Sequence, residues 1–239
     1  MDKEGVGFAT VLKKAQEKGY AERNPEADVE GYDACRKIAI LSSLMSGKHV
    51  DYEDIYTEGI SHISIEDFEY ARALNMAIKL LAMCKRNENG FFTIVAPFLI
   101  PYENPLANVN GVFNAVNVHG NMLGDVMFYG KGAGKNATAS AVVADVIDMV
   151  KHKGKHIEVN MNSEKATLTP KDNAVRRFFV RVSESLKDEA MELFGTDVDV
   201  VKRNSVPGEF AFITDLISEK DFEEKLWKLD SVKGYLRLY

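Results

Sequence analysis

Six short segments between residues 178 and 238 limit the possible folds more strongly than any other part of this chain. Four of them are rich in β-branched and aromatic residues and predict strands at 178–182, 198–202, 210–216 and 232–238. The other two carry apolar residues at helical spacing and predict helices at 186–194 and 219–229. The order βαββαβ is the ferredoxin-like order. We therefore expect residues 176–239 to fold as one unit, with a core that includes Phe222, Leu226 and Trp227.

Residues 1–150 combine helical and strand patterns. Apolar spacing and capping residues predict helices at 8–15, at 31–45, after Ser64 and at 138–150. Hairpins are predicted between 76–84 and 91–99, with a four-residue connection, and between 112–118 and 122–129. The expected fold class is α+β, with a mixed β-sheet covered by helices. The second helix is expected to bury a stripe formed by Ile38, Leu41, Leu44 and Met45.

Between these two parts lies a polar, lysine-rich segment at 151–175. It contains almost no aromatic residues, which is typical of a linker. We expect it to be loosely attached. Its His152 and His156 are four residues apart, but they lie in a solvated lysine run without a carboxylate in register, so no metal site is expected.

Composition excludes several classes of function. The chain has 239 residues, a net charge of −6 and a hydrophobic content of 46%. Because nucleic-acid binding depends on clustered Lys and Arg, no nucleic-acid partner is expected. The sequence has no run of about 18 apolar residues, so no membrane span is expected. Cys35 and Cys84 lie far apart and suit a reducing compartment, which favours a cytoplasmic protein.

Ionisable residues gather between Ala15 and Lys37, where one helix is expected to stop and another to start. Glu22 and Asp28 lie in the loop, and Asp33 and Lys37 lie four residues apart on one helix face. The simplest interpretation is a surface ion pair that stabilises the helix by about 0.3 kcal/mol. In the functional interpretation, three carboxylates hold a substrate ammonium group while the lysine donates a proton.

The same stretch carries a family resemblance. The run A-x3-G-Y-A-x2-N-P-x2-D-V-x-G-x-D-x3-K, which spans residues 15–37, resembles the signature of the homoserine dehydrogenase family. Further matches follow in order at 58–64 (EGISHIS), 106–116 (LANVNGVFNAV) and 130–142 (GKGAGKNATASAV). The resemblance covers roughly residues 5–150.

This resemblance implies a reaction and the roles of four residues. Enzymes of this family reduce L-aspartate 4-semialdehyde to L-homoserine with NADP or NAD as cofactor. By resemblance, Lys37 is the proton donor, and the base in the reverse direction. Asp33 and Glu22 are expected to bind the amino end of the substrate, with Asp28 as a supporting carboxylate.

The cofactor is expected to lie against two glycine-containing loops. By resemblance, Gly19 and Glu22 border its nicotinamide end, as does the backbone at Gly132 and, above all, at Gly134. The loop GKGAGK does not match a phosphate-binding P-loop, because the earlier Gly and the final Ser or Thr of that motif are absent. Without the resemblance, a purely structural strand-to-helix turn explains this loop equally well.

One part of the family pattern is missing from the sequence. It contains no G-x-G-x-x-G motif after a strand, which marks a dinucleotide-binding domain. We therefore expect a C-terminal fragment comprising a truncated catalytic and dimerisation domain (1–150), a linker (151–175) and a regulatory unit (176–239). Alone, the fragment is expected to be inactive.

The regulatory unit resembles an ACT domain in its order of elements. That resemblance implies binding of an amino acid, with L-threonine as the expected ligand, although dimerisation alone stays open. A homodimer through the strands at 76–129 is also expected. The competing class of function is a stand-alone amino-acid-binding regulatory module, in which the carboxylates recognise a ligand without catalysis.

Overall fold

The computed structural model describes residue 1 and residues 5–132, 134–159, 161–203 and 205–239. Within these ranges the largest element is a mixed seven-stranded sheet, formed by β1 (Tyr56–Thr57), β2 (Met76–Asn87), β3 (Gly90–Pro101), β7 (Phe178–Ser183), β8 (Asp199–Val200), β9 (Glu209–Ile213) and β11 (Val232–Leu238). Its strand order is β1-β3-β11-β7-β9-β8, and β2 pairs with β3. Two smaller sheets pair β4 (Phe113–Gly120) with β5 (Gly124–Lys131), and β6 (Val175–Arg176) with β10 (Ile217–Ser218).

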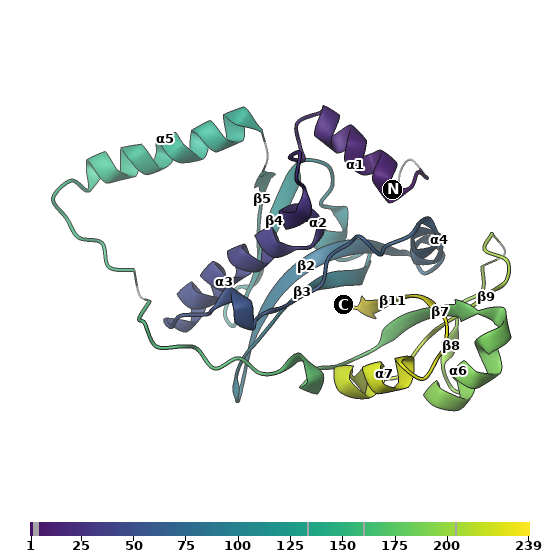
Figure 1. The fold of residues 1–239 in the computed structure, drawn as a ribbon. Helices are drawn as coiled ribbons and strands as arrows, with labels where there is room; N and C mark the ends of the chain where they lie inside the picture. Colours follow the sequence, from purple (N-terminus) through teal and green to yellow (C-terminus); the bar gives the residue numbers. More distant parts are fainter. Residues whose placement is uncertain (2–4, 133, 160, 204) are drawn as a thin grey trace.

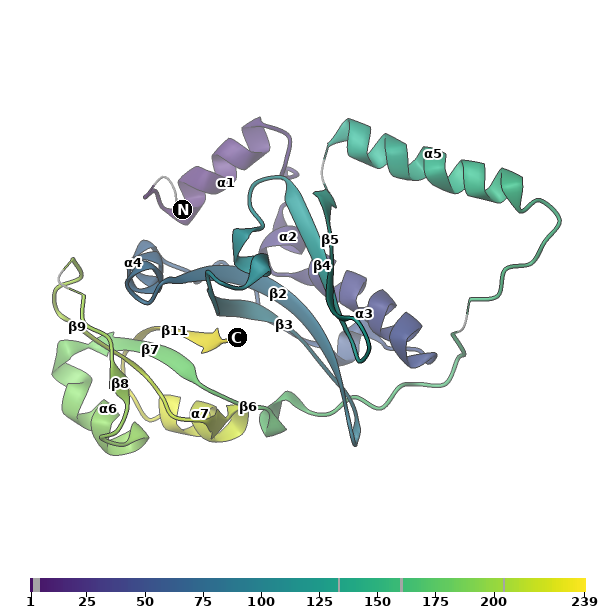
Figure 2. The same cartoon turned by 180° about the vertical axis from the view of Figure 1, so that it is seen from behind.

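The helices in the described ranges are α1 (Phe8–Glu17), α2 (Glu26–Val29), α3 (Tyr32–Ser46), α4 (Ile65–Ala73), α5 (Lys135–Lys151), α6 (Lys187–Phe194) and α7 (Glu219–Leu226). Figure 1 shows α3 against the β2–β3 hairpin, and α6 and α7 together below the C-terminal strands. Helices α1 and α5 extend away from the sheet at one end of the molecule (Figures 1 and 2). None of the helices in the described ranges is long and apolar enough to cross a membrane.

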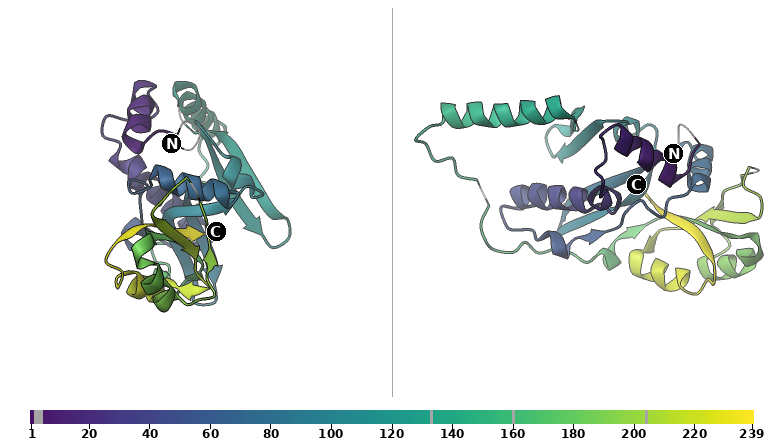
Figure 3. Two further views of the ribbon diagram at one scale, coloured as in Figure 1. Left: turned by 90° about the vertical axis from the view of Figure 1, so that its right-hand side faces the viewer. Right: turned by 45° about the horizontal axis from the view of Figure 1, so that its top comes forward.

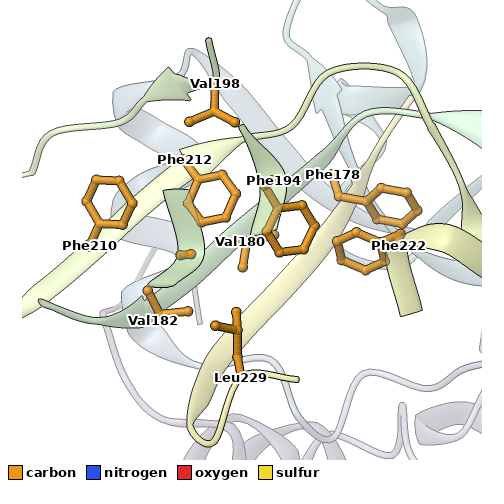
Figure 4. Packing of buried hydrophobic residues seen from close by; sticks show 10 residues of the cluster. Phe178, Val180, Val182, Phe194, Val198, Phe210, Phe212, Phe222 and Leu229 are labelled. Atoms are coloured by element: carbon orange, nitrogen blue, oxygen red, sulfur yellow. The ribbon is translucent and has the colours of Figure 1, made fainter. Parts of the chain in front are cut away.

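The C-terminal elements follow the predicted βαββαβ order, as β7, α6, β8, β9, α7 and β11. Alternate residues of the strands face α6 and α7, and Figure 4 shows the resulting core of phenylalanine and valine side chains. Helix α4 packs on the opposite face, because its Tyr70 and Ala71 share a hydrophobic cluster with Phe179 and Leu236. Both faces of these strands are therefore covered.

The prediction of a core position for Trp227 is wrong. Its side chain is 86% exposed. Phe222 fills the core instead, and its ring stacks on that of Phe178 with centroids 3.6 Å apart (Figure 4). Because each helical residue turns the side-chain direction by about 100°, five residues carry Trp227 away from the face that holds Phe222.

The helix predicted at 31–45 is α3, but its predicted buried stripe is wrong at three positions. Leu41, Leu44 and Met45 are exposed. The face that lies on the sheet carries smaller residues, namely Cys35, Ile38, Ala39, Ser42 and Ser43. Ser43 can be buried because its hydroxyl donates to a carbonyl one turn earlier at 2.8 Å and accepts from the N–H of Val50 at 2.9 Å.

The hairpin formed by β2 and β3 is tighter than predicted. Asn87 pairs with Gly90 across its end, so two residues form the turn rather than four. Gly90 has φ +136°, and a Cβ at this position would lie 2.3 Å from the carbonyl oxygen of Thr167. Glycine is therefore required by both the backbone conformation and the contact.

That contact comes from the segment predicted to be loosely attached, and the prediction is wrong for residues 162–169. The N–H of Asn162 donates to Gly47 at 3.0 Å, and the N–H of Phe91 donates to Thr167 at 2.9 Å. These backbone hydrogen bonds hold the segment along the end of α3 and the β2–β3 hairpin (Figure 1). They require no apolar side chains, so composition alone does not reveal them.

Strand β11 joins the two parts of the sheet. It pairs antiparallel with β7 and parallel with β3, where Arg237 lies opposite Phe98 and Leu238 opposite Leu99. Figure 3 shows this C-terminal strand, in yellow, running from the βαββαβ unit to the centre of the molecule. One continuous sheet therefore links residues of the first hairpin to the C-terminal unit.

Candidate active site

Helix α3 begins directly after a sharp turn at Gly31. This residue has φ +77° and caps the helix, and the short helix α2 ends at Val29 just before it. A Cβ at Gly31 would lie 3.2 Å from Cγ1 of Val95, so glycine lets this corner rest on β3. The α2–α3 corner, residues 26–33, places Asp33 in the first turn of α3, where the helix dipole favours a negative charge.

Asp33 and Lys37 form an ion pair on the surface of α3. Oδ2 of Asp33 lies 2.6 Å from Nζ of Lys37, and the two side chains are 46% and 68% exposed. An exposed pair of this kind contributes at most about 1 kcal/mol to folding. Both side chains therefore stay accessible to a ligand, and the carboxylate favours a position of the ammonium group beside it.

Glu22 and Asp28 lie on the loop and helix that precede this pair. The loop is held by Gln16, whose side-chain amide donates to the carbonyl of Glu22 at 2.9 Å. Asp28 lies in α2, and both acidic side chains are exposed. Among the described carboxylates, that of Asp33 is within 4 Å of the Lys37 ammonium group, whereas those of Glu22 and Asp28 are not. The roles predicted for Glu22 and Asp28 stay predictions.

The glycine loop connects β5 to α5. Gly132 is closely packed, since a Cβ there would lie 2.0 Å from Nδ2 of Asn114. Gly134 has φ +110° and directly precedes α5, and among the described residues other than its chain neighbours no atom lies within 4 Å of the position of its Cβ. Gly19, with φ +71°, is equally open. Figures 1 and 2 place the start of α5 at the same end of the molecule as the α1–α2 loop.

Residues 1–147 match the family model of homoserine dehydrogenase. The chain belongs to the homoserine dehydrogenase family. It is 42% identical over 197 residues to the homoserine dehydrogenase of Neisseria gonorrhoeae, covering 79% of this chain and 45% of that protein. It is 33% identical over 250 residues to the homoserine dehydrogenase of Bacillus subtilis, covering 98% of this chain and 57% of that protein.

The fold agrees with this family. A crystal structure of a homoserine dehydrogenase from Thiobacillus denitrificans is 32% identical and matches with a TM-score of 0.86, covering 100% of this chain and 60% of that chain. The chain spans about half the length of these curated homoserine dehydrogenases. The predicted site residues lie between Gly19 and Gly134, within the matched residues 1–147.

A buried ionic cluster beside the site of this homoserine dehydrogenase family member was not predicted. It joins Arg237, in β11, to Glu58 and Glu219, whose carboxylates lie 2.5 Å and 2.9 Å from its guanidinium nitrogens. Nε of Arg176 lies 2.9 Å from the same carboxylate of Glu219. One sequence feature could have revealed this cluster, namely the single arginine within the apolar strand GYLRLY. A charge buried in such a strand requires charged partners.

Glu58 is ionised within this cluster. Its Oε2 accepts a hydrogen bond from the Tyr56 hydroxyl at 3.0 Å, and Nε2 of His62 lies 3.3 Å from its Oε1. Burial raises the pKa of Glu58, but the hydrogen bond to His62 and the charge of Arg237 outweigh it and lower the pKa to about 2. His62 is therefore a partner of this carboxylate.

Proposed function

We propose that this chain supplies the substrate-binding and proton-transfer residues of a homoserine dehydrogenase, which converts L-aspartate 4-semialdehyde to L-homoserine with NADPH or NADH. The observation that carries this proposal is the Asp33–Lys37 pair, 2.6 Å apart and exposed, within the residues that match the family. The family match favours an enzyme over a stand-alone amino-acid-binding module.

The chemistry requires a positioned proton. When a carbonyl group accepts a hydride, negative charge develops on its oxygen, and a nearby ammonium group both stabilises that charge and supplies the proton. Lys37 is suited to this step because Asp33 holds its Nζ and both side chains are open to solvent. We assign the amino group of the substrate to Asp33 and Glu22, with Asp28 in support, since carboxylates bind ammonium groups.

The two glycine loops fit a nicotinamide cofactor, which would supply the hydride. Open backbone at Gly19 and Gly134 lets a flat ring approach without meeting a side chain. A side chain at Gly132 would displace the side-chain amide of Asn114 from its present position. We therefore propose Gly19, Glu22, Gly132 and Gly134 as the cofactor contacts of this chain.

We further propose that the remaining cofactor contacts come from a nucleotide-binding part comparable to that of longer relatives, of which this chain spans 45% to 60%. The test fuses the part of the Bacillus subtilis relative that this chain does not cover ahead of this chain, and follows NADPH absorbance with L-aspartate 4-semialdehyde. The fusion is expected to turn over, whereas this chain alone and the Lys37→Met fusion are not. Lys48→Met, an exposed lysine beyond the same helix, is the matched control. Turnover by the Lys37→Met fusion at the wild-type rate would overturn the proposal.

For the C-terminal unit we propose an ACT-type regulatory role with L-threonine as the ligand. The strand order β11-β7-β9-β8, with α6 and α7 on one face, supports this assignment. Calorimetric titration of the chain with L-threonine is expected to give a saturable heat. If L-threonine binds with a micromolar Kd, a ligand concentration of about 100 times that Kd nearly fills the site. No heat at this concentration would leave dimerisation as the role of this unit.

A homodimer is part of the proposal, and so is a cytoplasmic location. The β4–β5 hairpin exposes apolar residues on a two-stranded sheet of its own, including Val118, Met127 and Phe128. An exposed apolar patch of this kind is typical of an interface. Both cysteines are free, as expected in a reducing compartment. Sedimentation of the chain tests the dimer, and a monomer at micromolar concentration would contradict it.

A further inference from the structure

Gly59 is the point at which the buried ionic cluster approaches the candidate active site. A Cβ on Gly59 would lie 2.5 Å from the carbonyl oxygen of Val29 and 2.6 Å from Cα of Glu30. The N–H of Ile60 donates to that same carbonyl at 2.8 Å. Segment 58–60 therefore lies in direct contact with the backbone of the α2–α3 corner and supports it.

Glu58 anchors this segment from the other side. Its N–H donates to the carbonyl of Val95 at 2.8 Å, and its carboxylate accepts from Nη1 of Arg237 at 2.5 Å. Arg237 is 1% exposed, and its Nε and Nη2 donate to the carboxylate of Glu219 at 2.9 to 3.1 Å. Because the guanidinium group is planar and is held by two fixed carboxylates, it has a single orientation.

We propose that Arg237 is a positioning residue for the candidate active site. By holding Glu58, it fixes segment 58–60, and this segment fixes the corner that presents Asp28 and Asp33. Arg237 itself is buried in the sheet and acts on the site through Glu58. The consequence for substrate binding rests on the proposed function, whereas the mechanical coupling can be measured without it.

Arg181 provides a matched comparison within the same sheet. It is also a buried arginine that joins the C-terminal strands to the N-terminal part, and its Nε donates to Asp67 at 2.8 Å. Its Nη2 donates to the hydroxyl of Ser64 at 2.9 Å, so its contacts lead to the start of α4 rather than to the α2–α3 corner. Loss of either arginine removes a buried charge, but only one of them reaches Glu58.

Hydrogen exchange of backbone amides in this chain tests the coupling. The variants are Arg237→Met, Arg181→Met and Glu58→Gln. The last of these replaces the charge-assisted hydrogen bond to Nη1 of Arg237 with a weaker neutral one, while Arg237 keeps Glu219 as its partner. The quantity compared is the ratio of the exchange rate at the amides of Val29 and Ile60 to that at amides in the centre of β3. In Arg237→Met and Glu58→Gln this ratio is expected to rise about tenfold. In Arg181→Met this ratio is expected to stay unchanged.

The folded state of each variant is read from the same experiment, since general unfolding raises exchange in β3 as well. If Arg237→Met unfolds, the exchange ratio of Glu58→Gln alone decides whether the coupling exists. An unchanged ratio in Glu58→Gln, or an equal rise in Arg181→Met, would overturn the proposal.

A kinetic measurement in the fused enzyme separates this proposal from the proposed function. Misplacement of the substrate-binding carboxylates in Glu58→Gln is expected to raise KM for L-aspartate 4-semialdehyde about tenfold, with a smaller change in kcat. An inactive wild-type fusion contradicts the proposed function, while the exchange result still decides the coupling. An active Glu58→Gln fusion with wild-type KM contradicts the positioning role alone.

Discussion

Arg237 and Glu58 are 179 residues apart in the chain, yet Nη1 of Arg237 lies 2.5 Å from Oε2 of Glu58. Glu58 directly follows β1 and Arg237 lies in β11, and both of these strands pair with β3. Two arginines and two carboxylates, including Arg176 and Glu219, balance one another in this cluster. Such balance is required, since removing one partner of a buried pair costs about 3 to 5 kcal/mol.

Replacing Glu58 by Gln should change how stability depends on pH. The folded-state pKa of Glu58 is about 2, below its ordinary 4.5, so its ionised form stabilises the fold above pH 4.5. That contribution is lost as the pH falls from 4.5 to about 2, and its size is about 3 kcal/mol. In urea unfolding at pH 7, the free energy of unfolding is expected to be larger for wild type than for Glu58→Gln. This difference should shrink below pH 4.5. Glu88→Gln, in the exposed hairpin turn, is the control and should follow wild type. A constant difference between pH 7 and pH 2 would contradict the expectation.

Lys37→Met is expected to leave stability almost unchanged. Lys37 and Asp33 are both substantially exposed, so losing their ion pair should change the free energy of unfolding by less than about 0.5 kcal/mol. Lys171→Met is the contrasting variant, because Lys171 is largely buried and lies 2.5 Å from Glu223. Thermal unfolding measures both. A large loss in Lys37→Met would show that the pair is structural.

Gly59→Ala is expected to destabilise the chain by about 1 to 3 kcal/mol, because its methyl group would overlap the backbone at Val29. Gly130→Ala is the matched control, since in the described part of the chain no atom outside its chain neighbours lies within 4 Å of the position of its Cβ. Urea unfolding should show a loss only for Gly59→Ala. Equal stabilities of Gly59→Ala and Gly130→Ala would mean that the α2–α3 corner moves to accommodate the methyl group without loss of stability.

The fluorescence of Trp227 reports whether its surface is free. It is the single tryptophan of the chain and is 86% exposed, so its emission should be as red-shifted in the folded protein as in urea, and acrylamide should quench it efficiently. Trp227→Phe supplies the tyrosine background. A blue-shifted, protected emission would show that another surface covers this residue.

Elements with strong local signals could be predicted from the sequence. The capping pattern at Ser64 and Asp67 forms as expected, with N–H to side-chain hydrogen bonds in both directions. The helix spacing of Asp33 and Lys37 places them together as predicted. The βαββαβ order also follows from short, regular apolar segments.

Features that depend on contacts between distant segments could not be predicted. The face of α3 that is buried depends on which strand it meets, and Leu44 and Met45 look equally suitable from periodicity alone. The pairing of β11 with β3 and the partners of Arg237 join residues far apart in sequence, for which local propensity carries no information. The positions of Glu22 and Asp28 relative to Lys37 depend on the turn between α1 and α2 in the same way.

The parallel pairing of β11 with β3 has a consequence for biosynthesis. Until residues 232–238 have been made, the edge of β3, which carries the apolar run FFTIVAPFLI, has no β11 beside it. An uncovered apolar edge strand recruits other chains, and pairing over such a long separation is slow. Nascent chains should therefore depend on chaperones over this interval, and substitutions that slow the docking of β11 should lower the soluble yield more than the stability of the finished protein.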